Sequence, residues 1–138
     1  MSGFIVPDLP VDEGEEWTAL CAERELASIY LAAPGTESLR LERVAEASTG
    51  FVYCVSTYGV TGARESLSAD SSGLVAAVRP LTDTPLLVGV GISTPEHASQ
   101  AARFADGVIV GSALVRRLLE GDRRGALAVA TAFRSALP

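Results

Sequence analysis

The chain has the size and composition of one globular domain: 138 residues, of which 48% are hydrophobic and 20% are charged. Its formal charge of −6 argues against binding to nucleic acid or to an anionic membrane surface, because there is no basic excess to neutralise phosphates. No apolar run approaches the roughly 18 residues of a membrane span, and no signal segment is recognisable, so we expect a cytoplasmic protein.

In chain order, short β-rich apolar runs alternate with segments of helical periodicity. Five such rounds can be counted, which is typical of βαβ units and a parallel sheet. The expected strands are residues 4–6, 28–33, 51–55, 86–90 and 107–110. Because the strands are apolar on both faces, we expect a sheet covered on both sides, a condition that doubly wound sheets and barrels both satisfy.

The helices between these strands have recognisable ends. Asp12 and Glu15 have capping-box spacing and predict a helix that begins at Asp12, with Trp17, Leu20 and Cys21 on one face. The next helix follows the turn at residues 34–35 and ends at Gly50. Further helices are expected around residues 74–78, after Thr94 as N-cap with Pro95 in the first position, over residues 113–119 ending at Gly121, and over residues 124–137.

The cysteines and the single histidine give no reason to expect a metal site. Cys21 and Cys54 lie in apolar segments without a CxxC or Cys/His spacing, which predicts reduced, buried thiols. His97 falls in the turn after Pro95 and is expected to be an exposed helix residue. No set of metal ligands can be assembled from these residues, and no cofactor is predicted.

Three glycine-bearing turns follow strand ends: residues 59–62, residues 89–91, and Gly111-Ser112 at the start of a helix. Glycines let backbone amides approach an anion, and a helix N-terminus presents unpaired N–H groups. For any one of these glycines a tight turn is the better explanation, but together, on successive strands, they predict a phosphate site of the kind found in barrel enzymes. The first turn lies in the longest irregular stretch, which is a functional candidate on length alone.

Four segments, in this order, resemble the alpha-subunit family of tryptophan synthase: VPDLPVDE, FVYCVSTYGVTGARE, VGVGIST and DGVIVGSALV. The resemblance covers essentially the whole chain, and GVTGA is its most specific motif. It implies a partial (βα)8 TIM barrel of five βα units with parallel strands, forming a single domain over residues 1–138. The family cleaves indole-3-glycerol phosphate to indole and glyceraldehyde 3-phosphate without a cofactor, and passes indole to a pyridoxal-phosphate beta subunit.

The same resemblance implies particular substrate-binding residues. Gly62, Gly91 and Gly111-Ser112 match the family's phosphate-binding positions, Tyr53 matches a tyrosine that touches the substrate, and Thr61 matches a threonine of the lid. No catalytic residue can be assigned, because the family's acid–base glutamate and catalytic aspartate lie upstream of the matched strands. We therefore expect a truncated chain that binds the phosphate ester but is inactive alone.

The remaining carboxylates are expected to be structural. Glu13, Glu15 and Glu16 suit a first helical turn, and Glu96 and Asp106 also favour structural roles. Asp8 is as well explained by turn geometry as by a contact with the beta subunit. Glu65 is the only acidic residue near the glycine-rich turn at residues 59–62.

Five parallel strands leave two open edges, so inward-facing residues such as Ile5, Tyr53, Val88 and Ile109 need cover. We expect the isolated chain to form a homo-oligomer. Two alternatives stay open at this point: another phosphate-binding barrel enzyme, or a non-catalytic phosphate-binding or assembly module.

Overall fold

The computed structural model describes residues 2–56 and 69–138. In the described ranges the strands are β1 (Gly3–Ile5), β2 (Ala27–Ile29), β3 (Leu31–Ala32), β4 (Val52–Val55), β5 (Leu86–Gly89) and β6 (Gly107–Val108). The helices are α1 (Glu15–Glu23), α2 (Ser38–Ala47), α3 (Ala69–Val78), α4 (Pro95–Ala101), α5 (Ser112–Leu119) and α6 (Arg123–Ser135), with single 3-10 turns η1 (Val11–Glu13) and η2 (Arg79–Leu81).

Every strand pairing is parallel and follows chain order: β1 pairs with β2, and β3, β4, β5 and β6 form a four-stranded sheet. The expected strand over residues 28–33 is instead two strands, β2 and β3, separated by Tyr30. The backbone N–H of Tyr53 still donates to the Tyr30 carbonyl at 3.0 Å, so hydrogen bonding continues across the interruption. Sequential parallel order is the topology of a barrel segment.

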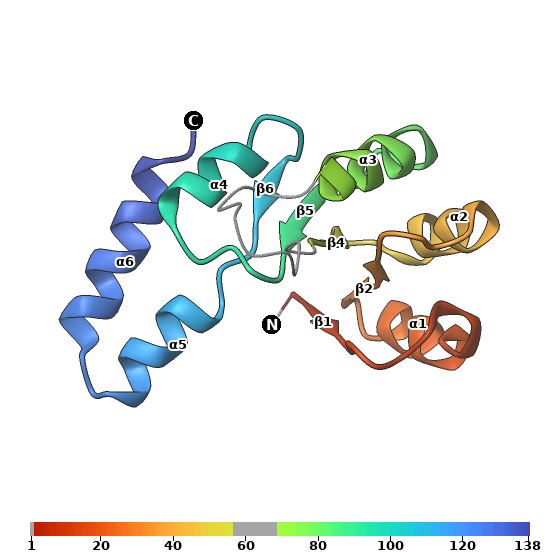
Figure 1. Cartoon of the computed structure of the whole chain (residues 1–138). Coiled ribbons are helices and arrows are strands. Elements are labelled where there is room, and N and C mark those ends of the chain that lie inside the picture. Colours follow the sequence, from red (N-terminus) through yellow and green to blue (C-terminus); the bar gives the residue numbers. More distant parts are fainter. Residues whose placement is uncertain (1, 57–68) are drawn as a thin grey trace.

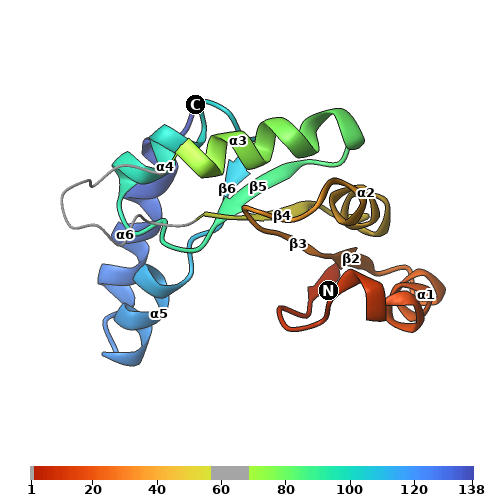
Figure 2. The ribbon, with the colours of Figure 1, turned by 45° about the vertical axis from the view of Figure 1, so that its right-hand side comes forward.

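The helices lie on the outer side of an arc whose inner side is formed by the strands (Figures 1 and 2). Burial alternates accordingly along β4, where Val52 and Cys54 are buried and Tyr53 and Val55 are only half-buried. The expected cover on both faces of the sheet is therefore wrong for the described residues. One face packs against helices, and the other faces the inside of the arc.

The core lies between the sheet and its helices. Leu86 and Val88 of β5 are completely buried there, together with residues of α2 and α3. Val88 thus faces the helices and not the inside of the arc, contrary to expectation, whereas its neighbour Leu87 shares the inner face with Tyr53. The one-residue alternation of a strand sets this assignment.

Both cysteines are free and buried, as the sequence predicted. Burial raises the pKa of the Cys54 thiol to about 11. A thiol that stays protonated is a poor nucleophile, so Cys54 acts as a small apolar core residue.

The first helix begins later than predicted. The capping box is wrong because the N-cap is Gly14 and no side chain caps α1. Asp12 instead lies in η1 and forms ion pairs with two arginines of α2, Arg40 at 2.7 Å and Arg43. The carboxylate therefore joins two segments rather than closing one helix end.

Two other predicted helix ends, at Thr94 and Gly121, are confirmed, whereas α2 ends at Ala47, before the predicted Gly50. Thr94 is the N-cap of α4 and its hydroxyl accepts a hydrogen bond from the His97 N–H at 3.3 Å, with Pro95 in the first turn. Gly35 and Gly121 both have positive φ, at 81° and 75°, which L-residues with a Cβ adopt only at a cost.

A buried tyrosine joins α1 to the sheet. Tyr30 is 3% exposed, and its hydroxyl donates to the Gly14 carbonyl at 2.8 Å and lies 2.8 Å from the Thr18 hydroxyl. A Cβ added at Gly14 would overlap that hydroxyl, so the close approach requires glycine.

We expect Tyr30→Phe to lower the free energy of unfolding by about 1–2 kcal/mol, because the Gly14 carbonyl loses its donor. Urea denaturation measures this. Tyr53→Phe is the matched control, since the Tyr53 hydroxyl makes no hydrogen bond to any described residue, and it should change stability by less than about 0.5 kcal/mol. Equal losses in the two variants would contradict the role given to the Tyr30 hydrogen bond.

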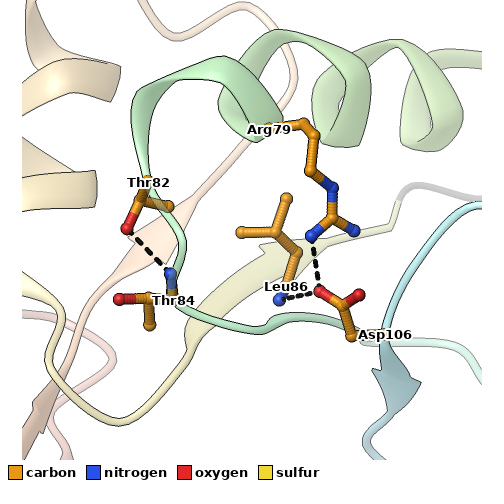
Figure 3. A network of polar contacts seen from close by, with 5 residues as sticks. All are labelled: Arg79, Thr82, Thr84, Leu86 and Asp106. Carbon is orange, nitrogen blue, oxygen red and sulfur yellow. Dashed lines mark hydrogen bonds and ion pairs between the residues drawn. The ribbon is translucent and has the colours of Figure 1, made fainter.

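A polar network fixes the amino ends of β5 and β6 (Figure 3). One oxygen of Asp106 accepts hydrogen bonds from the Arg79 guanidinium and from the Leu86 N–H, each at 2.7 Å. Close by, the Thr84 N–H donates to the Thr82 hydroxyl at 3.0 Å. The structural role expected for Asp106 is confirmed, at the end of the strands opposite to the glycine turns.

These hydrogen bonds, that from Arg79 first, lower the pKa of Asp106. A lowered folded-state pKa means that Asp106 stabilises the protein above its unfolded pKa of about 3.9, and that this contribution is lost as pH falls through the folded value. Because the side chain is 42% exposed, we expect Asp106→Asn to cost less than about 1 kcal/mol at pH 7.

The cost should shrink below about pH 4. Urea denaturation of Asp106→Asn at pH 7 and pH 3 measures this, with the exposed neighbour Asp83→Asn as the control that changes neither value. A loss of the same size at both pH values would show that packing, not charge, is responsible.

Candidate functional site at the carboxyl ends of the strands

The turn after β5 has an unusual backbone. Val90 and Gly91 both adopt left-handed conformations, with φ of 64° and 81°. Positive φ is strained for a β-branched residue, and such strain is found mostly at ligand sites where neighbouring contacts hold it. Val90 is 53% exposed, so burial of its own side chain does not hold the turn in place.

Ser56, directly after β4, holds this turn. Its N–H donates to the Gly89 carbonyl at 2.8 Å, and its hydroxyl lies within hydrogen-bond reach of the Gly89 carbonyl at 2.9 Å and of the Val90 carbonyl. Ser56 is 1% exposed. The end of one strand thus fixes the geometry of the turn that follows its neighbour.

Tyr53 reaches the same turn from the inner face of the sheet. A Cβ added at Gly89 would overlap the Tyr53 hydroxyl and ring, so glycine at 89 gives the tyrosine its position. The side chain is half-buried, because among residues 2–56 and 69–138 no helix covers this face of the sheet.

Gly111-Ser112 forms the start of α5, with Gly111 as N-cap. A Cβ at Gly111 would meet no described atom within 4 Å, and its φ of −113° is open to any residue. In the described part of the chain, packing and backbone conformation therefore give no reason for glycine there. An exposed helix start without a side chain leaves its first N–H groups accessible to an anion.

A cavity of about 470 Å³ brings the loops after β5 and β6 together. Ser93 from the first loop and Ser112 from the second line the same cavity, with Arg116 and Arg117 of α5 beside them and Phe133 of α6 contributing apolar surface. Glu120 also lines the cavity and lies 3.8 Å from Arg117, so Arg116, the two hydroxyls and the N-terminus of α5 are the groups suited to an anion.

His97 is buried, although it was expected to be exposed. It is only 8% exposed, and its Nδ1 lies 3.4 Å from the Ser93 hydroxyl. The first turn of α4 follows the carboxyl end of β5, so the histidine lies at the same end of the strands as the glycine turns. Glu96 next to it is structural, as expected: its own backbone N–H and the Thr94 hydroxyl lower the pKa of its carboxyl.

Of the residues singled out from sequence, the structure describes Tyr53, Gly91, Gly111 and Ser112, all at or near the carboxyl ends of their strands. Thr61, Gly62 and Glu65 lie outside the described residues. Sequence reasoning missed Ser56 and Ser93; the available signal was a hydroxyl residue one or a few positions beyond a strand end.

Within residues 2–56 and 69–138, no group of three or more His, Cys, Asp or Glu residues is arranged to hold a metal ion. The same ranges contain no helix that is both long and apolar enough to cross a membrane.

Parallel strands in chain order, helices outside them and glycine turns at their carboxyl ends define a segment of a (βα)8 barrel. The family model "Tryptophan synthase alpha chain" matches residues 1–135. The chain is 49% identical over 119 residues to the tryptophan synthase alpha chain of Mycobacterium tuberculosis, covering 86% of this chain and 44% of the relative. It is 47% identical over 116 residues to that of Chloroflexus aggregans, covering 84% and 43%.

Solved structures agree. Tryptophan synthase of M. tuberculosis superimposes with a TM-score of 0.84 at 44% identity, over 99% of this chain and 51% of that one. The tryptophan synthase α2β2 complex of Pyrococcus furiosus gives a TM-score of 0.81 at 36% identity, over 96% and 54%. The chain belongs to the tryptophan synthase alpha chain family, and it spans less than half the length of these curated relatives.

We expect Gly89→Ala to lower stability by about 1–3 kcal/mol, because the new methyl group forces Tyr53 out of its position. In a Tyr53→Ala background the same substitution should cost much less, since contacting residues are energetically coupled. Urea denaturation of the four proteins measures the coupling. Gly73→Ala, in exposed open space within α3, is the control and should stabilise slightly. Additive effects of Gly89→Ala and Tyr53→Ala would contradict the contact.

Proposed function

We infer that this chain supplies the phosphate-binding and substrate-contacting part of an indole-3-glycerol phosphate lyase, the alpha reaction of tryptophan synthesis. The observation that carries this proposal is the cavity in which Ser93 and Ser112, from successive strand ends, lie with Arg116 and Arg117. Membership of the family supplies the identity of the ester.

The electrostatics of the cavity suit a phosphate ester. The chain as a whole is acidic, yet this site combines two arginines with the positive end of α5, against one lining carboxylate, Glu120. Ser112 offers both its N–H and its hydroxyl, and Gly91 and Gly111 keep the neighbouring backbone free of side chains. In this proposal Gly91, Gly111 and Ser112 hold the phosphate.

Tyr53 is proposed to contact the organic part of the substrate. It lies on the inner face of the sheet against Gly89, and Gly91 follows Gly89 in the same turn. A ligand whose phosphate sits at the start of α5 would extend its apolar part toward the inner face. Thr61 and Gly62, outside the described residues, are proposed as the lid threonine and a further phosphate contact on the basis of their motif.

Proton transfer is proposed to need residues beyond these 138. Asp106 lies at the amino ends of the strands, away from a substrate at the carboxyl ends. Glu96 lies nearer to the carboxyl ends, but its carboxyl is bound to its own backbone N–H and to the Thr94 hydroxyl. We therefore propose that the 138 residues alone bind the ester without cleaving it. As part of a cytoplasmic alpha chain, they would work with a beta subunit, like the P. furiosus relative described as an α2β2 complex.

Titration of the chain with indole propanol phosphate and with inorganic phosphate, followed by calorimetry, tests the binding. The analogue should bind at least about tenfold more tightly than phosphate, because it adds apolar contact near Tyr53. Ser112→Ala should weaken both ligands about tenfold through loss of a charge-assisted hydrogen bond. Tyr53→Ala should weaken only the analogue.

Ser135→Ala at the end of α6 is the matched control and should bind both ligands like the original chain. Absence of saturable binding, or a Ser112→Ala variant that binds unchanged, would refute the proposed phosphate site. Indole release by the chain alone that persists through repeated purification would refute the proposed need for further residues.

A further inference from the structure

His97 is a buried polar residue that has no part in the phosphate site described above. It is the only histidine of the chain, and it is 8% exposed. Its backbone is fixed at the start of α4, because its N–H donates to the Thr94 hydroxyl at 3.3 Å and Pro95 occupies the first turn. A buried ring on a fixed backbone has a defined direction, so His97 can orient a neighbouring group.

The neighbouring group is a hydroxyl of the candidate site. The Nδ1 atom of His97 lies 3.4 Å from the Oγ atom of Ser93. This distance is long for a hydrogen bond, but contacts of this kind often shorten when a ligand enters a site. Of these two described residues only Ser93 lines the cavity, together with Ser112 and Arg116. His97 therefore acts on a ligand in the cavity through Ser93.

The proton of the Ser93 hydroxyl decides whether this side chain can bind an anion. A phosphate group offers oxygen acceptors, so Ser93 must donate to it. If Nδ1 of His97 carries no proton, the hydroxyl donates to the ring and turns its lone pairs toward the cavity. If Nδ1 carries a proton, the ring donates to the Ser93 oxygen, and the hydroxyl proton is free for the phosphate.

We propose that His97 is a positioning residue: its Nδ1–H donates to Ser93 and directs the Ser93 hydroxyl proton to the phosphate, which makes Ser93 a further phosphate contact. This inference rests on the proposed function, because it concerns the same phosphate group. Ser93 follows β5 and Ser112 follows the neighbouring strand β6, so the two hydroxyls approach from different loops (Figure 1). Donors from two loops fix the orientation of the phosphate as well as its position.

The state of the imidazole ring can be observed directly. Because the chain has one histidine, labelling with ¹⁵N-histidine gives one signal for Nδ1 and one for Nε2. NMR at neutral pH distinguishes a protonated nitrogen from an unprotonated one. We expect a protonated Nδ1 in the chain saturated with inorganic phosphate, and an unprotonated Nδ1 would overturn the proposal. The measurement uses the unaltered chain, so it does not depend on how any variant folds.

Calorimetric titration of variants with inorganic phosphate tests the coupling between the two residues. Ser93→Ala should raise the dissociation constant about tenfold, because it removes a hydrogen bond to a charged group. His97→Leu should raise it about threefold, because the hydroxyl loses the donor that orders and polarises it. In the Ser93→Ala background, His97→Leu should have no further effect on phosphate binding, since the two residues act as one unit.

His97→Asn is the conservative variant, because the amide nitrogen of asparagine, like Nδ1, is bonded to Cγ and can donate. It should bind phosphate within about twofold of the original chain. Tyr30→Phe is the control for loss of stability, since its hydroxyl contacts α1 and not the cavity. It should bind phosphate like the original chain. Circular dichroism checks that each variant is folded.

Three results with folded variants would overturn the proposal: unchanged binding by Ser93→Ala or His97→Leu, losses that add in the double variant, or a loss in His97→Asn as large as that in His97→Leu. Phosphate binding that is lost in Ser112→Ala but is independent of Ser93 and His97 would overturn this proposal alone. Absence of phosphate binding by the original chain would overturn it together with the proposed function.

Discussion

The parallel ladder between β4 and β5 is the interaction on which the rest of the structure depends. Its register places Val52 and Cys54 opposite Leu86 and Val88, and all four side chains turn toward the helices. Because successive side chains in a strand point to opposite faces, the same register turns Tyr53 and Leu87 toward the inside of the arc. A slip of one residue would bury Tyr53 under the helices and separate it from Gly89. The pairing that builds the core therefore also builds the inner surface of the candidate site.

The two ends of this ladder serve different purposes. At the amino ends, Asp106 accepts two hydrogen bonds and ties β6 to β5 and to Arg79. At the carboxyl ends, Ser56 holds a turn in which Val90 has a positive φ. The strained backbone of Val90 thus lies at the end where a ligand would bind, and the hydrogen bonds of Asp106 lie at the opposite end, where they serve stability. This division, typical of barrels, explains why Asp106 is a poor candidate for proton transfer.

Much of the fold could be predicted from the sequence, because the decisive signals are local. Thr94-Pro95 predicted the start of α4, and apolar runs predicted the strands, with β2 and β3 expected as one. The failures needed information from elsewhere in the chain. Asp12 has the spacing of a capping box, but two arginines of α2, about 30 residues on, bind its carboxylate instead. His97 was expected to be exposed in the turn after Pro95, yet α4 turns it inward. Val88 was assigned to the wrong face, since a strand that is apolar at every position has no alternation that identifies its buried side.

The candidate site shows the same limit. Gly91 and Gly111-Ser112 stand out in the sequence, but the serines that join them to their surroundings do not. Ser56 matters because its hydroxyl reaches the carbonyls of Gly89 and Val90, more than thirty positions away. Ser93 matters because it shares a cavity with Ser112. Both relations are created by the parallel ladder, which brings consecutive carboxyl ends to one edge of the sheet. Motifs indicate which turns can bind an anion. Strand order determines which of those turns lie close enough together to bind one anion jointly.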